Sequence, residues 1–167
     1  EKINERTREL VTLQYNTYNR SLVPLMHQHG IVVIDAFEDL SESQAAFVDR
    51  YFEDNVYPVL TPMAVDASRP FPLIRNKTLN IAALLSKKKG KAEKEEIEFA
   101  TVQVPSVLPR LVHIPSEDGN EKTFILLEQV IERNIDKLFL NYDVLCAYPY
   151  RVMRNADLSI DEDEAAD

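Results

Sequence analysis

The chain has 167 residues, of which 45% are hydrophobic and 28% charged, a profile typical of a globular protein with one sizeable core. Its formal net charge of −9 argues against general affinity for nucleic acids or anionic membranes. No stretch reaches the roughly 18 apolar residues that a membrane-spanning helix needs, and no signal peptide is visible.

Residues 2–28 are predicted to form one long helix. Pro24 should bend this helix or start a new turn, and Gly30 should end it. The apolar residues of one face recur at spacings of four and three: Val11, Tyr15, Tyr18, Leu22 and Leu25. The chain begins without Met and ends in an acidic run, so we expect a piece of a longer protein whose other parts covered this face.

Residues 31–36 form a short apolar run rich in β-branched side chains, which predicts a buried strand. Ser41 and Gln44 have the spacing of a capping box and predict the start of a second helix. This helix is expected to end before Pro58, because proline disfavours helical geometry at the preceding Tyr57.

Residues 58–77 contain four prolines, which exclude a regular central strand and indicate an ordered, extended connection. Residues 78–86 and 97–104 are predicted strands that pair as a hairpin. The loop between them carries five lysines: Lys87, Lys88, Lys89, Lys91 and Lys94. We interpret this loop as a solvated hairpin tip or, alternatively, as a weak, salt-sensitive site for a polyanion.

Two further strands are predicted at residues 110–114 and 123–127, followed by helical spacing over residues 127–138. The last strand spans residues 144–154, where Pro149 restricts it to a sheet edge or a bulge. Simple alternation places five of its residues on one side: Val144, Cys146, Tyr148, Tyr150 and Val152. The sum is an α+β fold, with a mixed sheet of about five or six strands packed with two helices and preceded by one long helix.

Several kinds of chemistry lack support in the sequence. The three glycines are isolated, so a glycine-rich phosphate loop is excluded. His27, His29, His113 and Cys146 lack the spacing of a zinc site, and no metal site is predicted. Cys146 is the only cysteine, which excludes an internal disulfide and is typical of a reducing cytoplasm.

The candidate site residues are cationic. Arg69, Arg75 and Lys77 lie in the proline-rich connection, and Arg151 and Arg154 lie at the end of the last strand. The planar fork of arginine pairs well with phosphate oxygens, and the prolines reduce the entropy lost when the connection is ordered. The alternative is structural pairing with nearby acids, which contributes only about 0 to 1 kcal/mol per pair at a solvated surface.

Three irregular strings carry a family resemblance: RPFPLIRNKTLN (69–80), VPSVLPRLVHIP (104–115) and YRVMRNADLSIDEDEA (150–165). In these strings the chain resembles the head, or middle, domain of bacterial type 1 polyphosphate kinase. The resemblance implies that residues 1–29 end a helical N-terminal domain and that residues 30–160 form the head domain. Residues 161–167 would then begin an acidic connection to catalytic domains that follow.

The resemblance implies a cytoplasmic or peripheral parent enzyme that reversibly transfers the terminal phosphate of ATP to polyphosphate, through a phosphohistidine and with Mg²⁺. The catalytic histidines of the family belong to the later domains, so no catalytic residue and no cofactor are assigned to this chain. The expected partners are the remaining domains, further copies in a homo-oligomer, and inorganic polyphosphate. We expect the piece to frame the active-site tunnel and to be inactive alone; the alternative is an autonomous polyanion-binding module.

Overall fold

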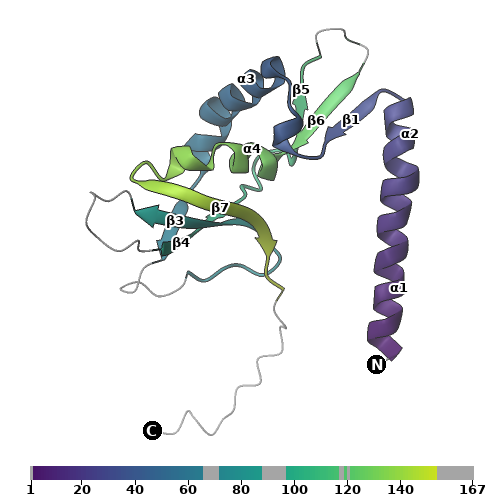
Figure 1. The fold of residues 1–167 in the computed structure, drawn as a ribbon, viewed down its shortest axis with the longest axis horizontal. Coiled ribbons are helices and arrows are strands. Elements are labelled where there is room, and N and C mark those ends of the chain that lie inside the picture. The colour runs from purple at the N-terminus through teal and green to yellow at the C-terminus, as the bar shows by residue number, and fades with distance from the viewer. Residues whose placement is uncertain (1, 66–71, 88–96, 117–118, 120, 154–167) are drawn as a thin grey trace, which may run out of the picture.

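The computed structural model describes residues 2–65, 72–87, 97–116, 119 and 121–153. In these residues the chain forms seven strands in two sheets, with helices packed against them and a long helix standing beside them (Figure 1). The α+β class and the leading helix are confirmed, and the strands are divided between two sheets. No helix of the described residues is long and apolar enough to cross a membrane.

The first helical segment is continuous but changes its winding. Helix α1 (Lys2–Thr17) passes into a π-helical turn, η1 (Tyr18–Leu22), and then into α2 (Val23–Gln28). Pro24 lies in the first turn of α2, so the predicted new turn at this proline is confirmed. Gly30 ends the segment with a φ of 69°, and its N–H donates to the carbonyl of His27 over 3.0 Å.

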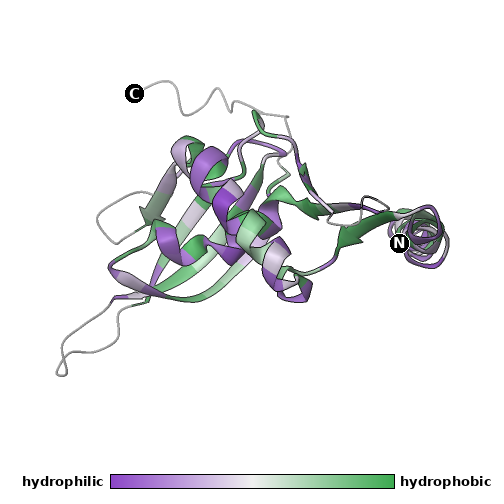
Figure 2. Cartoon of the chain, turned by 90° about the horizontal axis from the view of Figure 1, so that it is seen from above, coloured by the Kyte–Doolittle hydropathy of each residue, from purple (hydrophilic) through white to green (hydrophobic). Residues whose placement is uncertain are grey.

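The apolar face of this helix has no cover in the described part of the chain. All residues of α1 are exposed, and Figure 2 shows the helix end-on and apart from the sheets. The predicted face remains between 44% and 64% exposed, at Val11, Tyr15, Tyr18, Leu22 and Leu25. Packing against the other described residues therefore does not explain the amphipathic pattern.

The smaller sheet has the strand order β1-β6-β5. Strand β1 (Ile31–Ile34) pairs in parallel with β6 (Lys122–Leu126), which pairs antiparallel with β5 (Leu111–Ile114). The predicted first strand is confirmed, but the prediction that it is buried is wrong. It is half-buried because it lies at the sheet edge with one neighbouring strand.

Helix α3 (Glu42–Tyr51) begins as the sequence predicts, with Ser41 accepting from the amide of Gln44 and Gln44 reaching back to the Ser41 amide. The helical path then continues through η3 (Phe52–Val56) and η4 (Tyr57–Val59). The helix and its π-helical continuation end at Val56, before Pro58 as expected, but the expectation that Tyr57 leaves helical geometry is wrong. Tyr57 keeps helical dihedrals of −51° and −44°, because Pro58 falls in the first turn of a new 3₁₀ segment, where its missing N–H is not needed.

The larger sheet is antiparallel, with the order β2-β4-β3-β7. Strands β3 (Leu79–Lys87) and β4 (Ile97–Gln103) form the predicted hairpin; four of its loop lysines, Lys88, Lys89, Lys91 and Lys94, lie outside the described residues. Strand β2 (Pro62–Val65) is an edge strand that begins at a proline. Strand β7 (Tyr142–Arg151) forms the other edge, which accommodates Pro149 as predicted.

A β-bulge changes the faces of β7. Leu84 pairs with Cys146 and Leu85 pairs with Val144, so the intervening Leu145 has no partner. Val144 and the later Ala147 both pack against the core, and Tyr148 is 67% exposed. The prediction that Val144 shares one side with Cys146, Tyr148 and Tyr150 is wrong, because the extra residue inverts the alternation.

The core lies between the helices and the two sheets. Helix α4 (Leu127–Arg133) and the 3₁₀ segment η5 (Ile135–Leu138) replace the single predicted helix, and η2 (Phe37–Asp39) joins β1 to α3. The largest fully buried side chains of the core cluster come from all of these layers: Val48, Phe52, Ile81, Leu85, Ile114, Ile125, Leu127 and Ile131. The larger sheet thus rests on a continuous core, which fixes the end of the sheet where the candidate cations lie.

Candidate functional site

The candidate site is built on a tight turn that enters β3. Residues 75–78 form this cationic turn, in which the N–H of Thr78 donates to the carbonyl of Arg75 over 3.4 Å. Lys77 takes the left-handed conformation, with a φ of 63°, at a turn position that favours glycine. Ile74, just before the turn, is buried and anchors the segment, so Arg75 and Lys77 are exposed on a fixed base.

The end of β7 lies directly beside this turn. The N–H of Lys77 donates to the carbonyl of Val152 over 2.8 Å, and Arg151 pairs with Leu79 in the sheet. The fold therefore brings Arg151 to the same end of the larger sheet as Arg75 and Lys77, although Arg151 lies far from them in the sequence. The other two candidates, Arg69 and Arg154, lie outside the described residues.

Two arginines elsewhere show what structural pairing looks like in this fold. Arg110 donates through Nε to Glu128 over 3.1 Å, and this bond raises the pKa of Arg110. Arg133 forms an ion pair of 2.8 Å with Asp49. Within the described residues, by contrast, no carboxylate lies within ion-pair distance of Arg75 or Arg151, and both are exposed. Both side chains therefore differ from Arg110 and Arg133, which are paired with carboxylates within the described residues.

Two neutral residues behind the turn were not singled out from the sequence. Thr78 donates through Oγ1 to the carbonyl of Arg75 over 2.8 Å. Asn80, only 1% exposed, donates through Nδ2 to the carbonyl and to Oγ1 of Thr78, over 3.0 and 3.1 Å. The available signal was a buried amide in the first positions of an otherwise apolar strand, since such an amide needs a partner.

The remaining polar candidates do not assemble into a centre. His27 and His29 are exposed at the end of α2, and the His113 ring lies 5.3 Å from that of Phe124. Cys146 is half-buried. In the part of the chain that the structure describes, no group of three or more His, Cys, Asp or Glu residues is arranged to hold a metal ion.

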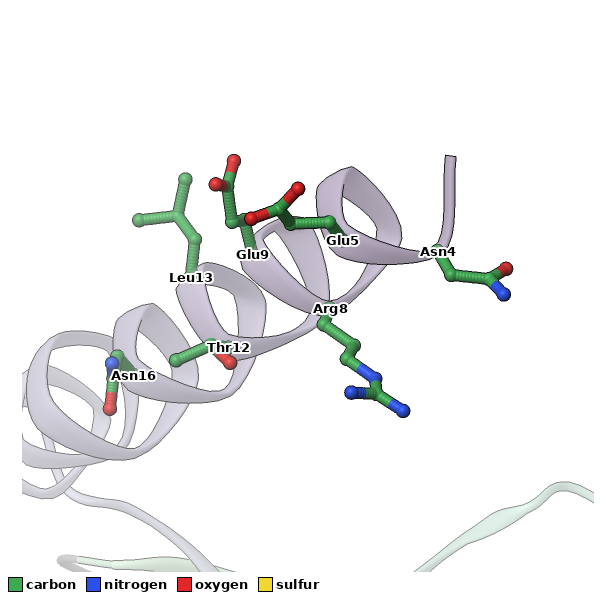
Figure 3. Close-up of a pocket in the computed structure, with 7 residues that line it drawn as sticks. All are labelled: Asn4, Glu5, Arg8, Glu9, Thr12, Leu13 and Asn16. Atoms are coloured by element: carbon green, nitrogen blue, oxygen red, sulfur yellow. The ribbon is translucent and has the colours of Figure 1, made fainter. Parts of the chain in front are cut away.

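A shallow hollow lies beside α1, and its volume is about 1000 Å³. Figure 3 shows that one helix supplies its entire lining, with Glu5 and Glu9 on one side and Arg8 on another. A single helix cannot surround a small ligand, so this surface is no binding pocket by itself. The cationic turn is the better candidate, since the backbone of a second segment, the end of β7 with Arg151, lies directly beside it.

Comparisons with known proteins agree with this architecture. A family model described as the polyphosphate kinase middle domain matches residues 43–167. A polyphosphate kinase of Lactiplantibacillus plantarum is 48% identical over 165 residues, covering 99% of this chain and 22% of that protein. A polyphosphate kinase of Halalkalibacterium halodurans is 46% identical over 166 residues, covering 99% of this chain and 23% of that protein.

The same relationship is visible in a solved structure. The crystal structure of polyphosphate kinase from Porphyromonas gingivalis is similar to this fold with a TM-score of 0.78 and 28% sequence identity. The match covers 96% of this chain and 25% of that one. The present chain therefore spans about a quarter or less of the length of these relatives.

Proposed function

This chain belongs to the polyphosphate kinase family, through the middle domain of that family, and from this premise we propose that it is part of an ATP:polyphosphate phosphotransferase. The parent enzyme would transfer the terminal phosphate of ATP reversibly to inorganic polyphosphate through a phosphohistidine. The observation that carries this proposal is the family match over residues 43–167, together with 48% identity to a polyphosphate kinase. The single cysteine favours a cytoplasmic location for the parent.

Neither ATP nor Mg²⁺ is assigned to this domain. Among the described residues, no group of three or more His, Cys, Asp or Glu side chains is arranged to hold a metal ion. Both would be held by other parts of the parent.

We propose the same division of the chain that the resemblance implies. Residues 1–29 would end a helical N-terminal domain, residues 30–160 would form the head domain, and residues 161–167 would begin the connection to catalytic domains. The exposed apolar face of α1 and α2 supports the first boundary, since a solvated helix gains nothing from such a face. We expect this apolar face to pack against the remaining domains of the parent or against another copy in a homo-oligomer.

The proposed role of the piece is assembly and framing of the active-site tunnel, without turnover of its own. A phosphate-accepting histidine needs cationic groups around it, whereas His113 packs against Phe124 and His27 and His29 lie on an exposed helix end. The purified chain should show no ATP-dependent growth of polyphosphate with Mg²⁺ present, in an assay where a whole relative serves as the positive control. Growth by the purified chain would contradict this role.

A second candidate function is an autonomous contact with polyphosphate at the cationic turn. It is favoured by one observation, the convergence of Arg75, Lys77 and Arg151 without carboxylate partners in the described residues. Isothermal titration with medium-chain polyphosphate should show binding that weakens with salt and with Arg75→Ala. Arg50→Ala is the matched control, because Arg50 is an exposed arginine on α3 away from the turn. Equal affinity in all three proteins would exclude this contact.

A further inference from the structure

We propose that Thr78 and Asn80 are positioning residues, which hold the cationic turn in the conformation that meets a chain of linked phosphates. The inference rests on the polyphosphate contact proposed above and extends it to residues that carry no charge. Three features of the turn support this role: a hydrogen bond from the Thr78 hydroxyl, the buried amide of Asn80 and the left-handed conformation of Lys77.

The hydroxyl bond closes the turn. Thr78 donates to the Arg75 carbonyl twice, through Oγ1 over 2.8 Å and through its N–H over 3.4 Å. The side-chain bond is the shorter of the two, and the backbone bond is longer than the usual upper value of about 3.2 Å and therefore weak. Without the hydroxyl, the direction in which Arg75 leaves the turn would depend on the weaker bond alone.

The buried amide directs that hydroxyl. Asn80 donates through Nδ2 to Thr78 Oγ1 over 3.1 Å, which occupies an acceptor position on the oxygen and leaves its hydrogen for the Arg75 carbonyl. The same Nδ2 group donates to the Thr78 carbonyl over 3.0 Å. Asn80 is almost fully buried, so water cannot replace these bonds without opening the strand. The result is a relay from Asn80 through Thr78 to the backbone of Arg75.

The third feature is the strain at Lys77. Its φ of 63° is costly for a residue with a Cβ, and glycine would adopt it freely. The turn is nevertheless held, by the bond from the Lys77 N–H to Val152 and by the relay at Thr78. A strained residue held by its surroundings is typical of sites where the side chain is used. Here the side chain is an exposed ammonium beside Arg75, which matches a phosphate chain.

A matched pair of variants of the whole chain tests the positioning role. Thr78→Ser keeps the hydroxyl, whereas Thr78→Val keeps the shape and removes it. Titration with medium-chain polyphosphate at low salt should give an affinity within about twofold of the unaltered chain for Thr78→Ser and a loss of about five- to tenfold for Thr78→Val. Hydrogen exchange of the Thr78 and Lys77 amides, a readout that needs no ligand, should accelerate in Thr78→Val only.

The outcomes separate this inference from the function on which it rests. If Arg75→Ala weakens binding and Thr78→Val does not, the positioning role is wrong and the polyphosphate contact stands. If neither substitution changes the affinity, the contact itself is wrong and the positioning role falls with it. Should Thr78→Val fail to fold, Asn80→Ser replaces it, since a serine hydroxyl is too short to reach the Thr78 carbonyl; unchanged affinity and exchange in that variant would overturn the proposal.

Discussion

Asp49 and Arg133, 84 positions apart in the sequence, form a two-pronged ion pair that joins α3 to α4. Arg133 Nε lies 2.8 Å from Oδ1 of Asp49, and Nη2 lies 3.0 Å from Oδ2. The hydrogen bonds from Arg133 lower the pKa of Asp49. A guanidinium matches a carboxylate in this fork-to-fork geometry, so the pair sets the orientation of two helices as well as their separation.

Replacing Arg133 with lysine should therefore destabilise the fold by about 1 kcal/mol, although the charge is kept, because the second hydrogen bond is lost. Urea unfolding at neutral pH measures the change. Arg6→Lys is the control, since the Arg6–Glu9 pair on α1 is mostly exposed and should contribute almost nothing. Equal effects in both variants would show that the geometry at Asp49 adds no stability.

The pair between Asp49 and Arg133 also predicts that the stability of the fold decreases in acid. The folded pKa of Asp49 lies below its ordinary value of 3.8, so its stabilisation is complete above that value and is lost as the pH falls through the lower, folded pKa. The stability difference between the unaltered chain and Asp49→Asn should consequently shrink below about pH 4. A difference that stays constant down to pH 2.5, measured by thermal or urea unfolding, would contradict this assignment.

Glu132 should change the stability of the fold with pH in the opposite direction to Asp49. Burial, followed by the charges of Glu128 and Glu38, raises the pKa of Glu132 from 4.5 to about 7, and its Oε1 has no hydrogen-bond partner in the described structure. Between these two values the unfolded chain loses the proton and the folded chain keeps it, so stability contributed by this residue falls as the pH rises from 4.5 to about 7.

Substitution Glu132→Gln isolates this effect. The variant should gain about 1 kcal/mol of stability at pH 8, a figure reduced to allow for the partial solvation of the side chain, and nothing at pH 4.5. Urea unfolding at the two pH values is the measurement. A gain of the same size at both values would mean that packing, not ionisation, separates the two side chains.

Lys77 offers a test of strain. Lys77→Gly should be at least as stable as the unaltered chain, whereas Lys77→Val should lose about 1 to 2 kcal/mol, because a β-branched residue tolerates a positive φ poorly. Thermal unfolding gives both values. If Lys77→Gly also binds polyphosphate more weakly, then stability favours glycine at this position and binding favours lysine. A clear loss of stability in Lys77→Gly would contradict the strain and would show that packing of the Lys77 side chain stabilises the turn.

Gly30 is a second position with a positive φ, at the junction between α2 and β1. Gly30→Ala should cost about 1 kcal/mol, and Gly30→Asn less, because asparagine adopts the left-handed conformation more readily than alanine. Circular dichroism during thermal unfolding follows both. The reverse order of the two variants would indicate that space near the Cβ, and not φ, governs the junction.

Local patterns in the sequence were sufficient for much of the fold. The capping box at Ser41, the hairpin of β3 and β4 and the helix end at Gly30 each depend on residues close together in the chain, and each is confirmed. The division into two sheets and the bulge at Leu145 were not predicted, because both depend on which distant strands pair and in which register. The prediction for Tyr57 failed because the residue before a proline is only biased away from helical geometry, and here Pro58 falls in the first turn of a 3₁₀ segment.

In the candidate site, too, local features were predictable from the sequence and long-range pairing was not. Its cations were visible in the sequence as arginine and lysine beside prolines, but the convergence of Arg75 and Arg151 depends on the pairing of β3 with β7. The relay through Thr78 and Asn80 was not identified, since the sequence does not reveal that Asn80 is buried or which groups its amide contacts. Arg69 and Arg154 remain candidates on sequence grounds alone.

The pairing of β1 with β6 also determines when the protein can fold. Strand β1 is made early, but its partner is made late, and the Phe37 amide likewise donates to Gln129, 92 positions further along. Closing such long loops has an entropic cost that local contacts cannot offset, which slows folding. During synthesis the apolar strand β1 therefore stays unpaired until β6 has also left the ribosome, and an unpaired apolar strand is prone to aggregate during this interval.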